Sequence, residues 1–523
     1  MLTDIIPRPQ AQPILEEGMF HCSGELTLER RDFEDWGFRA FAERLKKKNI
    51  ILVEGSGEPV LRVLRDGTFD EEEYGLEVRS GGVTLRAASA RGVVQGLTSL
   101  YESFEKKNIP CFILRDKPLY RHRGLSLDCT RHFFDAAEVE RILEEMSLVK
   151  LNVLHWHLSD DQGWRIESRV HPKLNRISGP FYSQDEIRHI VAFAKERGIE
   201  VIPEIDLPGH TTGILAAYPE LSCQGEPVEL GKGGGIYPVI LCAGKKQVYE
   251  FLFPLLDEAA GLFDSPIFHL GGDEVPKREW EKCPHCKAAA EKNGLANLDD
   301  LQGWFTTRLA ERLAAKGKIV RCWNDILKAK TLPENLDIQY WVDWSQSGAM
   351  NAFLDKGREA VFSDMFTLYL DYPESLIPLE KVYRYEPALE GRSLAGVLGV
   401  LGMEACIWTE RIAAAERLEK ALFPRLFALA EAAWSGGGDY AGFERRLVGK
   451  LAGLAERGVA FTTLEESNPQ GDERLAGIKQ WFIQGAQGAA PEEDKMPDPE
   501  QLTRIRTMFA QGFNLPRGLF SGQ

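Results

Sequence analysis

Residues 183–210, SQDEIRHIVAFAKERGIEVIPEIDLPGH, contain a helix pattern followed directly by a strand pattern. Ser183 and Glu186 have the spacing of a capping box, which predicts the first turn of a helix. The apolar residues that follow recur with the helical period: Ile187, Ile190, Val191 and Ala194. Gly198 is expected to end this helix, and residues 200–205 form a short apolar run typical of a buried strand.

The same strand-and-helix rhythm extends over most of the chain. Apolar runs occur at residues 125–127, 153–158, 200–205, 267–270, 319–322, 338–341, 360–362 and 397–407. Segments with helical period lie between most of them, and a last one follows the eighth run at residues 418–434. Eight such units over roughly 310 residues predict an α/β fold of the (β/α)8 TIM-barrel type. A doubly wound open sheet is the alternative, but no G-x-G-x-x-G sequence follows the first strand.

The barrel is expected to span residues 119–440, between two smaller regions. Residues 1–118 predict a small α/β domain, because two alternating segments meet at Gly81-Gly82 as a hairpin and a helical pattern follows at residues 93–104. Residues 441–523 are rich in Ala, Leu and Arg and predict a helical appendage, interrupted by a polar segment at 484–500.

Charge and hydropathy exclude several classes of protein. The 523 residues include 79 Asp and Glu against 63 Lys and Arg, a formal net charge of −16, which argues against nucleic-acid or anionic-membrane binding. No apolar run approaches the ~18 residues of a membrane span, so no membrane insertion is expected. The first residues lack the basic start and apolar stretch of a secretory signal, which predicts a cytoplasmic protein. The sequence does not predict the oligomeric state.

The nine cysteines do not resemble a disulfide framework, since their number is odd and they are widely spread. Cys283 and Cys286 have C-x-x-C spacing, but no second C-x-x-C pair completes a four-ligand zinc site. We therefore expect ordinary loop thiols, no metal and no cofactor. Cys223 and Cys242 could meet across one loop, which the sequence alone cannot show.

Polar and aromatic residues follow almost every predicted strand. In a barrel of this type the carboxyl ends of the strands carry the active site. The residues at these positions are Asp128, Asp160, Asp161, Glu204, Asp206, His210, Asp273, Glu274, Trp323, Asn324, Asp325, Trp341, Tyr369, Asp371, Trp408 and Glu410. Aromatic faces pack on the C–H surfaces of pyranoses while carboxylates accept hydroxyl hydrogen bonds, so this composition predicts a sugar pocket.

The longer motifs resemble one known family. They are Arg123-Gly followed by Asp128 and Arg131-His-Phe, the HWHLSDDQ stretch at 155–162, PEIDLPGH at 203–210 and HLGGDE at 269–274. In this order they resemble the β-N-acetylhexosaminidases of glycoside hydrolase family 20. The resemblance covers the whole predicted barrel, and the first ~118 residues are similar to the α/β domain that precedes it in that family.

The resemblance implies an exo-acting enzyme that hydrolyses terminal β-linked GlcNAc or GalNAc with retention. Family members use substrate assistance, in which the 2-acetamido oxygen attacks the anomeric carbon and forms an oxazolinium intermediate. Glu274 would be the general acid and base, and Asp273 would accept the acetamido N–H. If the fourth strand continued through both residues, their side chains would point to opposite sides.

The resemblance also implies roles around this pair. Tyr369 would bind the acetamido oxygen, Trp323, Trp341 and Trp408 would wall the pocket, Arg123 would bind the 3- and 4-hydroxyls, and Asp371 and Glu410 would bind the 4- and 6-hydroxyls. Asp160 and His210 would tune Glu274, and Asp206 would orient His210. One departure is Asp325, where family members often have Glu two residues after the fifth-strand Trp, and it leaves a contact beside the pocket open.

Other interpretations remain for several of these residues. His155 and His157 share one face of a strand and are expected to be hydrogen-bonded residues lining the barrel, although H-x-H also suits a metal-dependent amidohydrolase. A sugar-binding relative without activity is a third hypothesis. Asp160 and Asp206 also suit helix caps, and we expect an Asp128–Arg131 structural ion pair. Trp156, Trp164 and Trp434 are expected in the core or at the rim, and residues 231–235 (GKGGG) in a mobile surface loop.

Overall fold

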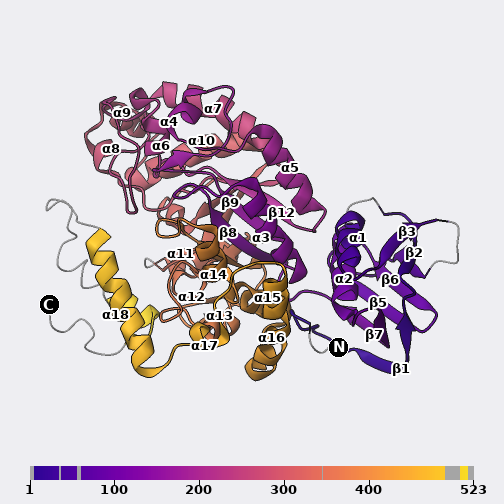
Figure 1. Cartoon of the computed structure of the whole chain (residues 1–523). Coiled ribbons are helices and arrows are strands. Elements are labelled where there is room, and N and C mark those ends of the chain that lie inside the picture. The colour runs from indigo at the N-terminus through magenta and orange to yellow at the C-terminus, as the bar shows by residue number, and fades with distance from the viewer. Residues whose placement is uncertain (1–4, 34–36, 56–59, 344–345, 489–506, 516–523) are drawn as a thin grey trace.

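The computed structural model describes residues 5–33, 37–55, 60–343, 346–488 and 507–515, and its centre is a closed barrel of eight parallel strands (Figure 1). In chain order these are β8 (His122–Asp128), β9 (Val153–His157), β12 (Glu200–Glu204), β13 (Ile267–His269), β14 (Ile319–Trp323), β15 (Leu336–Tyr340), β16 (Ala360–Phe362) and β19 (Val400–Ile407), and β19 pairs with β8 to close the ring. Each overlaps one of the predicted apolar runs, so the predicted TIM barrel is confirmed.

Helices surround the barrel as the periodicity predicts. The longer ones are α3 (Ala136–Leu148), α5 (Gln184–Lys195), α7 (Lys246–Ala260), α10 (Leu298–Ala314), α11 (Ser347–Leu354), α14 (Ala415–Leu422) and α15 (Arg425–Ser435). The capping box of Ser183 and Glu186 is present at the start of α5. The predicted helix at residues 418–434 is divided around Pro424, since proline donates no backbone hydrogen bond. Residues 324–335, all described, hold only the 3-10 helix η3 (Asn324–Lys328) between β14 and β15.

The loops at the carboxyl ends of the strands are long and contain short elements of their own. These are β10 (Ser159–Asp160), β11 (Gly163–Trp164), α4 (Lys173–Ile177), α6 (Thr212–Leu215), η2 (Pro219–Leu221), α8 (Arg278–Lys282), α9 (Pro284–Lys292), α12 (Met365–Leu368) and α13 (Leu379–Tyr383). Two further short strands, β17 (Ala388–Leu389) and β18 (Arg392–Ser393), lie in the connection from α13 to β19. The strands themselves are short, so the loops supply most of the side chains above the barrel.

The N-terminal region is a seven-stranded sheet with two helices, α1 (Phe38–Lys47) and α2 (Ala90–Ser103). The sheet order is β1 (Ile14–His21), β7 (Asn108–Asp116), β5 (Tyr74–Arg79), β6 (Gly82–Ala87), β4 (Leu61–Arg65), β2 (Glu25–Arg30) and β3 (Ile51–Glu54). The predicted hairpin is β5 and β6, with Arg79 opposite Gly82. This region has an apolar core of its own, which also takes in Trp434.

The C-terminal region is helical. It contains α16 (Tyr440–Glu456), α17 (Leu464–Ser467), α18 (Gly471–Gly488) and a helical turn at residues 507–512. Phe443, Leu447 and Leu454 on α16 join the barrel core. Residues 489–500 of the predicted polar segment lie outside the described residues. In the described part of the chain, no helix has the length and apolar character needed to cross a membrane.

The three tryptophans expected in the core or rim are core residues. Trp156 and Trp164 are fully buried in the barrel core, and Trp434 is fully buried under the N-terminal sheet. The Nε1 of Trp434 donates to the Asp116 carboxylate at 3.0 Å. The indole of a barrel helix therefore fills the N-terminal core and joins the two regions.

Arg123 belongs to this junction and not to the sugar pocket, so its predicted role was wrong. It is the second residue of β8 and lies at the amino end of the barrel. Its guanidinium is fully buried and donates both terminal nitrogens to Glu72, at 2.8 and 2.8 Å. The Nε donates to the Lys150 carbonyl at 3.0 Å. The Arg-Gly motif marks the start of the strand, whereas the active site lies at its opposite end.

We expect Arg123→Met to destabilise the protein by about 3–5 kcal/mol, because it leaves the Glu72 carboxylate buried without its partner. Thermal and denaturant unfolding would measure this loss, while KM of the folded enzyme should stay unchanged. The control is Arg121→Ala, which removes an exposed pair with Glu359 and should cost less than about 1 kcal/mol. A stable Arg123→Met protein with a raised KM would contradict this account and show that Arg123 contributes to substrate binding.

Candidate active site

The loop after β13 carries Asp273 and Glu274 in a conformation that a strand cannot supply. The strand ends at His269, and Gly271, Gly272 and Glu274 have positive φ angles of 60°, 92° and 50°. A Cβ on Gly271 would lie 1.9 Å from Oδ1 of Asp206, so only glycine fits there. The strand therefore does not continue through Asp273 and Glu274. The expectation that their side chains point to opposite sides of a strand does not apply to this turn.

Asp206 holds this turn. It was expected to orient His210, but the hydrogen bond that its side chain accepts comes from the loop backbone. Its Oδ1 accepts the backbone N–H of Gly272 at 2.8 Å, while the side chain of Gln302 donates to the Gly272 carbonyl at 2.7 Å. Burial and the neighbouring Asp273 carboxylate raise the pKa of Asp206 well above its usual range. Asp206 thus positions the loop that carries Asp273 and Glu274.

His210 is held instead by the two carboxylates of the loop after β9. Its Nδ1 lies 3.3 Å from Oδ1 of Asp160 and 3.2 Å from Oδ2 of Asp161. On the other side of the ring, Nε2 lies 3.7 Å from Oε2 of Glu274. Asp161, for which no role was expected, also accepts the backbone N–H of Thr212 at 3.0 Å and so fixes the start of α6.

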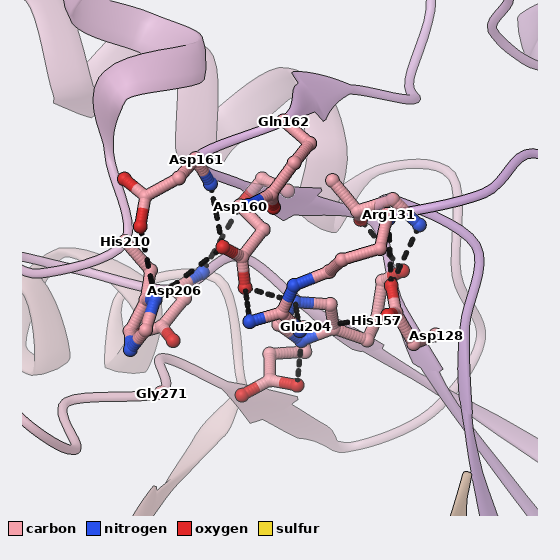
Figure 2. A network of polar contacts seen from close by, with 12 residues as sticks. Asp128, Arg131, His157, Asp160, Asp161, Gln162, Glu204, Asp206, His210 and Gly271 are labelled. Atoms are coloured by element: carbon pink, nitrogen blue, oxygen red, sulfur yellow. Dashed lines mark hydrogen bonds and ion pairs between the residues drawn. The ribbon is translucent and has the colours of Figure 1, made fainter. Parts of the chain in front are cut away.

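A buried network connects this group to the inside of the barrel (Figure 2). His157 lies between Glu204, 2.5 Å from its Nδ1, and Asp160, 2.9 Å from its Nε2. His155 contacts Glu204 at 3.2 Å and Glu404 at 2.9 Å. The expectation that His155 and His157 are hydrogen-bonded residues lining the barrel is confirmed.

The network fixes the charges of its members. Burial alone would raise the pKa of Glu204, but the nearby His157, His269 and His155 hold it well below its usual range. Burial likewise opposes the protonation of His157 and His210, yet their carboxylate partners raise both pKa values well above that of a free histidine. Negative and positive groups therefore alternate from Glu204 through His157 and Asp160 to His210.

Asp273 and Glu274 differ in their surroundings. The Glu274 side chain is 32% exposed and faces His210. The Oδ1 of Asp273 is buried and has no hydrogen-bond partner among the described residues. Burial, with a smaller contribution from the neighbouring Glu274, raises the pKa of Asp273 to about 7. Asp273 can therefore accept a hydrogen bond from a ligand that enters the site.

The four predicted aromatic residues lie together in an arc. Trp341 and Tyr369 are nearly parallel, with ring centroids 6.1 Å apart, and Tyr369 meets Trp408 at 5.9 Å. Trp408 is followed by Trp323 at 6.0 Å, whose Nε1 donates to Glu204 at 2.9 Å. The arc is thus anchored to the buried network at its Trp323 end.

Arg131, which was expected to have only a structural role, places a guanidinium in this site. The expected ion pair with Asp128 is present at 3.5 Å, but Arg131 also contacts Asp160 at 2.6 Å and lies 4.0 Å from Glu410. It sits 5.2 Å from the Trp408 ring centre. Arg131 follows the carboxyl end of β8, and this position in the sequence could have indicated that it belongs to the site.

Asp371 and Glu410 complete this side of the pocket. The backbone N–H of Trp408 donates to Oδ1 of Asp371 at 3.5 Å. Burial and the nearby Glu410 carboxylate raise the pKa of Asp371 to about 8. Burial also raises the pKa of Glu410, an effect that Arg131 opposes. The two carboxyl groups therefore share one region beside Trp408.

The glycine-rich loop lies against this side of the site. Residues 232–235 are exposed, as expected of a surface loop. The carbonyl of Gly233 accepts the side-chain N–H of Gln162 at 2.6 Å, and a Cβ on Gly234 would lie 3.1 Å from Cγ of Glu410. The glycines allow the loop backbone to approach Glu410 closely.

The departure at residue 325 has a structural role. The Oδ2 of Asp325 accepts the indole N–H of Trp341 at 3.0 Å, and its Oδ1 pairs with Lys328 at 3.2 Å. The shorter carboxylate thus fixes one end of the aromatic arc from within η3, and a contact with ligand is not required to explain it.

Comparison with known families agrees with this geometry. The chain matches the family described as "Glycosyl hydrolase family 20, catalytic domain" over residues 120–437, and "Glycosyl hydrolase family 20, domain 2" over residues 2–117. The chain belongs to glycoside hydrolase family 20. It is therefore a glycoside hydrolase, as its strand-end motifs predicted.

Curated relatives and solved structures carry related names. A Beta-hexosaminidase of Vibrio furnissii is 32% identical over 72% of this chain and 67% of its own length, and one of Akkermansia muciniphila is 30% identical over 73% and 83%. The chain spans only 54% of a Porphyromonas gingivalis Beta-hexosaminidase, at 32% identity. The crystal structure of a Bacteroides fragilis beta-N-acetylhexosaminidase superimposes with a TM-score of 0.80 at 28% identity, covering 90% of this chain and 99% of that one.

We expect Asp325→Ala to raise KM about fivefold, because it removes the hydrogen bond that Asp325 accepts from the indole N–H of Trp341 and costs about 1 kcal/mol of positioning. Steady-state kinetics on an aryl N-acetylglucosaminide would measure this change. Asp325→Asn keeps an oxygen acceptor for Trp341 and is the matched control, with a KM near that of the wild type. Equal KM values in all three proteins would show that Asp325 does not hold the arc.

Proposed function

We propose that this chain is an exo-acting β-N-acetylhexosaminidase that releases terminal, non-reducing β-linked GlcNAc or GalNAc by a retaining, substrate-assisted mechanism. The family and the names of its relatives support the reaction class. A solved relative from Vibrio harveyi, an Exo beta-N-Acetylglucosaminidase in complex with N-acetylglucosamine, has a TM-score of 0.79 at 27% identity over 89% of this chain.

One observation carries the mechanism: a buried, unpartnered Asp273 oxygen stands next to a partly exposed Glu274. A nucleophilic carboxylate must face the anomeric carbon, whereas an oxygen held back in a buried turn suits an acceptor for a neutral N–H. The 2-acetamido group of the substrate offers such an N–H. Once Asp273 binds it, the acetamido oxygen is directed at C1.

The reaction then proceeds in two steps. Glu274 donates its proton to the glycosidic oxygen as the acetamido oxygen attacks C1, the C1–O bond breaks and the aglycone leaves as an alcohol. Asp273 stabilises the positive charge of the oxazolinium that forms. Glu274, now ionised, takes a proton from water, the water oxygen attacks C1, and the ring opens to restore the acetamide. Two displacements at C1 give net retention.

His210, together with the carboxylates of Asp160 and Asp161, assists Glu274 during this cycle. A protonated His210 stabilises the Glu274 carboxylate after proton donation, and Asp160 and Asp161 keep His210 charged. Tyr369, Trp341, Trp408 and Trp323 form the wall for the acetamido and pyranose faces. Arg131 replaces Arg123 as the group that binds ring hydroxyls, with Asp371 and Glu410 as acceptors.

The two rival functions have less support. For a metal-dependent amidohydrolase, His157 would have to coordinate an ion, but both of its ring nitrogens already contact carboxylates. An inactive sugar-binding relative would be expected to lack the acid, whereas Glu274 stands beside His210.

We also propose, as expected from the sequence, that the protein acts in the cytoplasm.

A paired substrate assay tests the proposed function. We expect rapid hydrolysis of aryl β-N-acetylglucosaminide and no measurable hydrolysis of the aryl β-glucoside, because the glucoside has no acetamido oxygen to attack C1. Glu274→Gln should lower kcat at least about 10²-fold on the first substrate. Fast cleavage of the glucoside, or near-normal turnover by the variant, would overturn the proposal.

The pH dependence of kcat/KM tests the role of Asp273. Only the ionised carboxylate accepts the acetamido N–H and stabilises the oxazolinium, and the raised pKa of about 7 means that a proton occupies it below that pH. We therefore expect kcat/KM to fall as the pH falls through about 7. Asp273→Asn should be slow and should lack this acidic limb. A flat wild-type profile between pH 5 and 7 would contradict an Asp273 that titrates there.

A further inference from the structure

Four cysteines that lie far apart in the sequence gather beside the active-site loops. Cys223 follows η2, Cys242 lies beyond the glycine-rich loop, and Cys283 and Cys286 flank the first turn of α9. Their sulfur atoms all lie within 4.8 Å of one another. Three of the side chains are buried, and that of Cys223 is half-buried. The structure thus brings Cys223 and Cys242 together, which the sequence left open, and adds Cys283 and Cys286 to them.

The spacing of the sulfurs is that of a tetrahedral metal site. Cys242 lies 3.6 Å from Cys286 and 3.7 Å from Cys283, and Cys223 lies 3.9 Å from Cys286. A tetrahedron of thiolates around zinc, with Zn–S bonds of about 2.3 Å, has edges of about 3.8 Å. A disulfide would need about 2.05 Å. We propose that Cys223, Cys242, Cys283 and Cys286 bind one structural zinc ion.

The backbone of Gly244 contacts two of the four sulfurs. The backbone of Gly244 hydrogen-bonds the sulfurs of Cys242 and Cys286, an interaction that stabilises thiolates. A Cβ on Gly244 would lie 2.1 Å from the His285 carbonyl oxygen, so this close approach requires glycine. Trp280 is fully buried beside the cluster, and its Nε1 donates to the Leu241 carbonyl at 2.9 Å.

The ion would clamp both ends of the glycine-rich loop to α9. Between Cys223 and Cys242 the loop reaches the active site, where the N–H of Gly231 donates to the Asp161 carbonyl at 2.8 Å. The N–H of Leu241 donates to the Pro208 carbonyl, two residues before His210, at 3.2 Å. Since four thiolates fill the coordination sphere, the zinc has no open position for chemistry, and its role is to hold this wall in place.

Elemental analysis of the full chain, purified without chelators, tests the proposal. We expect one zinc per chain in the wild type and less than a tenth of that in Cys286→Ala. Cys111→Ser removes a buried thiol of the N-terminal sheet and is the matched control, which should retain one zinc. Retention of zinc by Cys286→Ala, or iron in place of zinc in the wild type, would overturn the assignment.

Two further measurements on the wild type keep the test valid if Cys286→Ala does not fold. After unfolding with a chelator, all nine cysteines should titrate as free thiols, whereas a deficit of two or four would indicate disulfides in place of a metal site. Replacement of zinc by Co²⁺ should give intense thiolate charge-transfer and tetrahedral ligand-field absorption. The weak spectrum of octahedral cobalt would contradict a four-thiolate site. None of these readouts depends on the proposed hydrolytic activity.

Discussion

The Glu204 carboxylate is the point on which the barrel and its active site depend. It is fully buried at the carboxyl end of β12 and contacts side chains from three other strands: His155 and His157 on β9, His269 on β13 and Trp323 on β14. A carboxylate removed from water costs several kcal/mol unless its oxygens are fully paired. These partners meet that condition only when neighbouring strands keep their register, so one charge fixes the geometry of half of the barrel.

From Glu204 the constraint passes to the reacting groups. His157 connects it to Asp160, Asp160 and Asp161 hold His210, and His210 faces Glu274. The same carboxylate holds Trp323, the inner end of the aromatic arc. The proposed acid, Glu274, and the aromatic arc are therefore both linked to one buried group, and a change at Glu204 would disturb both together.

The sequence predicted the barrel well because a strand buried on both faces is a short apolar run, and because helix signals such as Ser183 and Glu186 are local. It placed the aromatic arc and the Asp273–Glu274 pair correctly at strand ends. It failed where the answer depends on position along a strand or on distant loops. Arg123 is the second residue of β8 while Arg131 follows the end of that strand, and the residues beside an arginine do not show which end of the strand it occupies.

The sequence did not predict the bond between Asp206 and Gly272 or the cysteine cluster, for a related reason. The bond from Gly272 to Asp206 arises from a tight turn that begins where β13 stops at His269, so the chain does not continue as a strand through Asp273 and Glu274. Cys223 and Cys242, in the loop after β12, reach Cys286 only when this loop packs against the loop after β13. Tertiary packing of loops is not encoded in local periodicity.

The central claim is that the substrate supplies the nucleophile and this protein supplies only the acid and the acetamide-binding groups. The most direct measurement replaces the acetyl hydrogens of an aryl N-acetylglucosaminide by one, two and three fluorines and follows kcat/KM. Each fluorine withdraws electrons from the amide oxygen, so the account predicts a steep, progressive fall in kcat/KM along the series. A rate that does not change across the series would show that the acetamido oxygen does not attack C1, and would contradict the account.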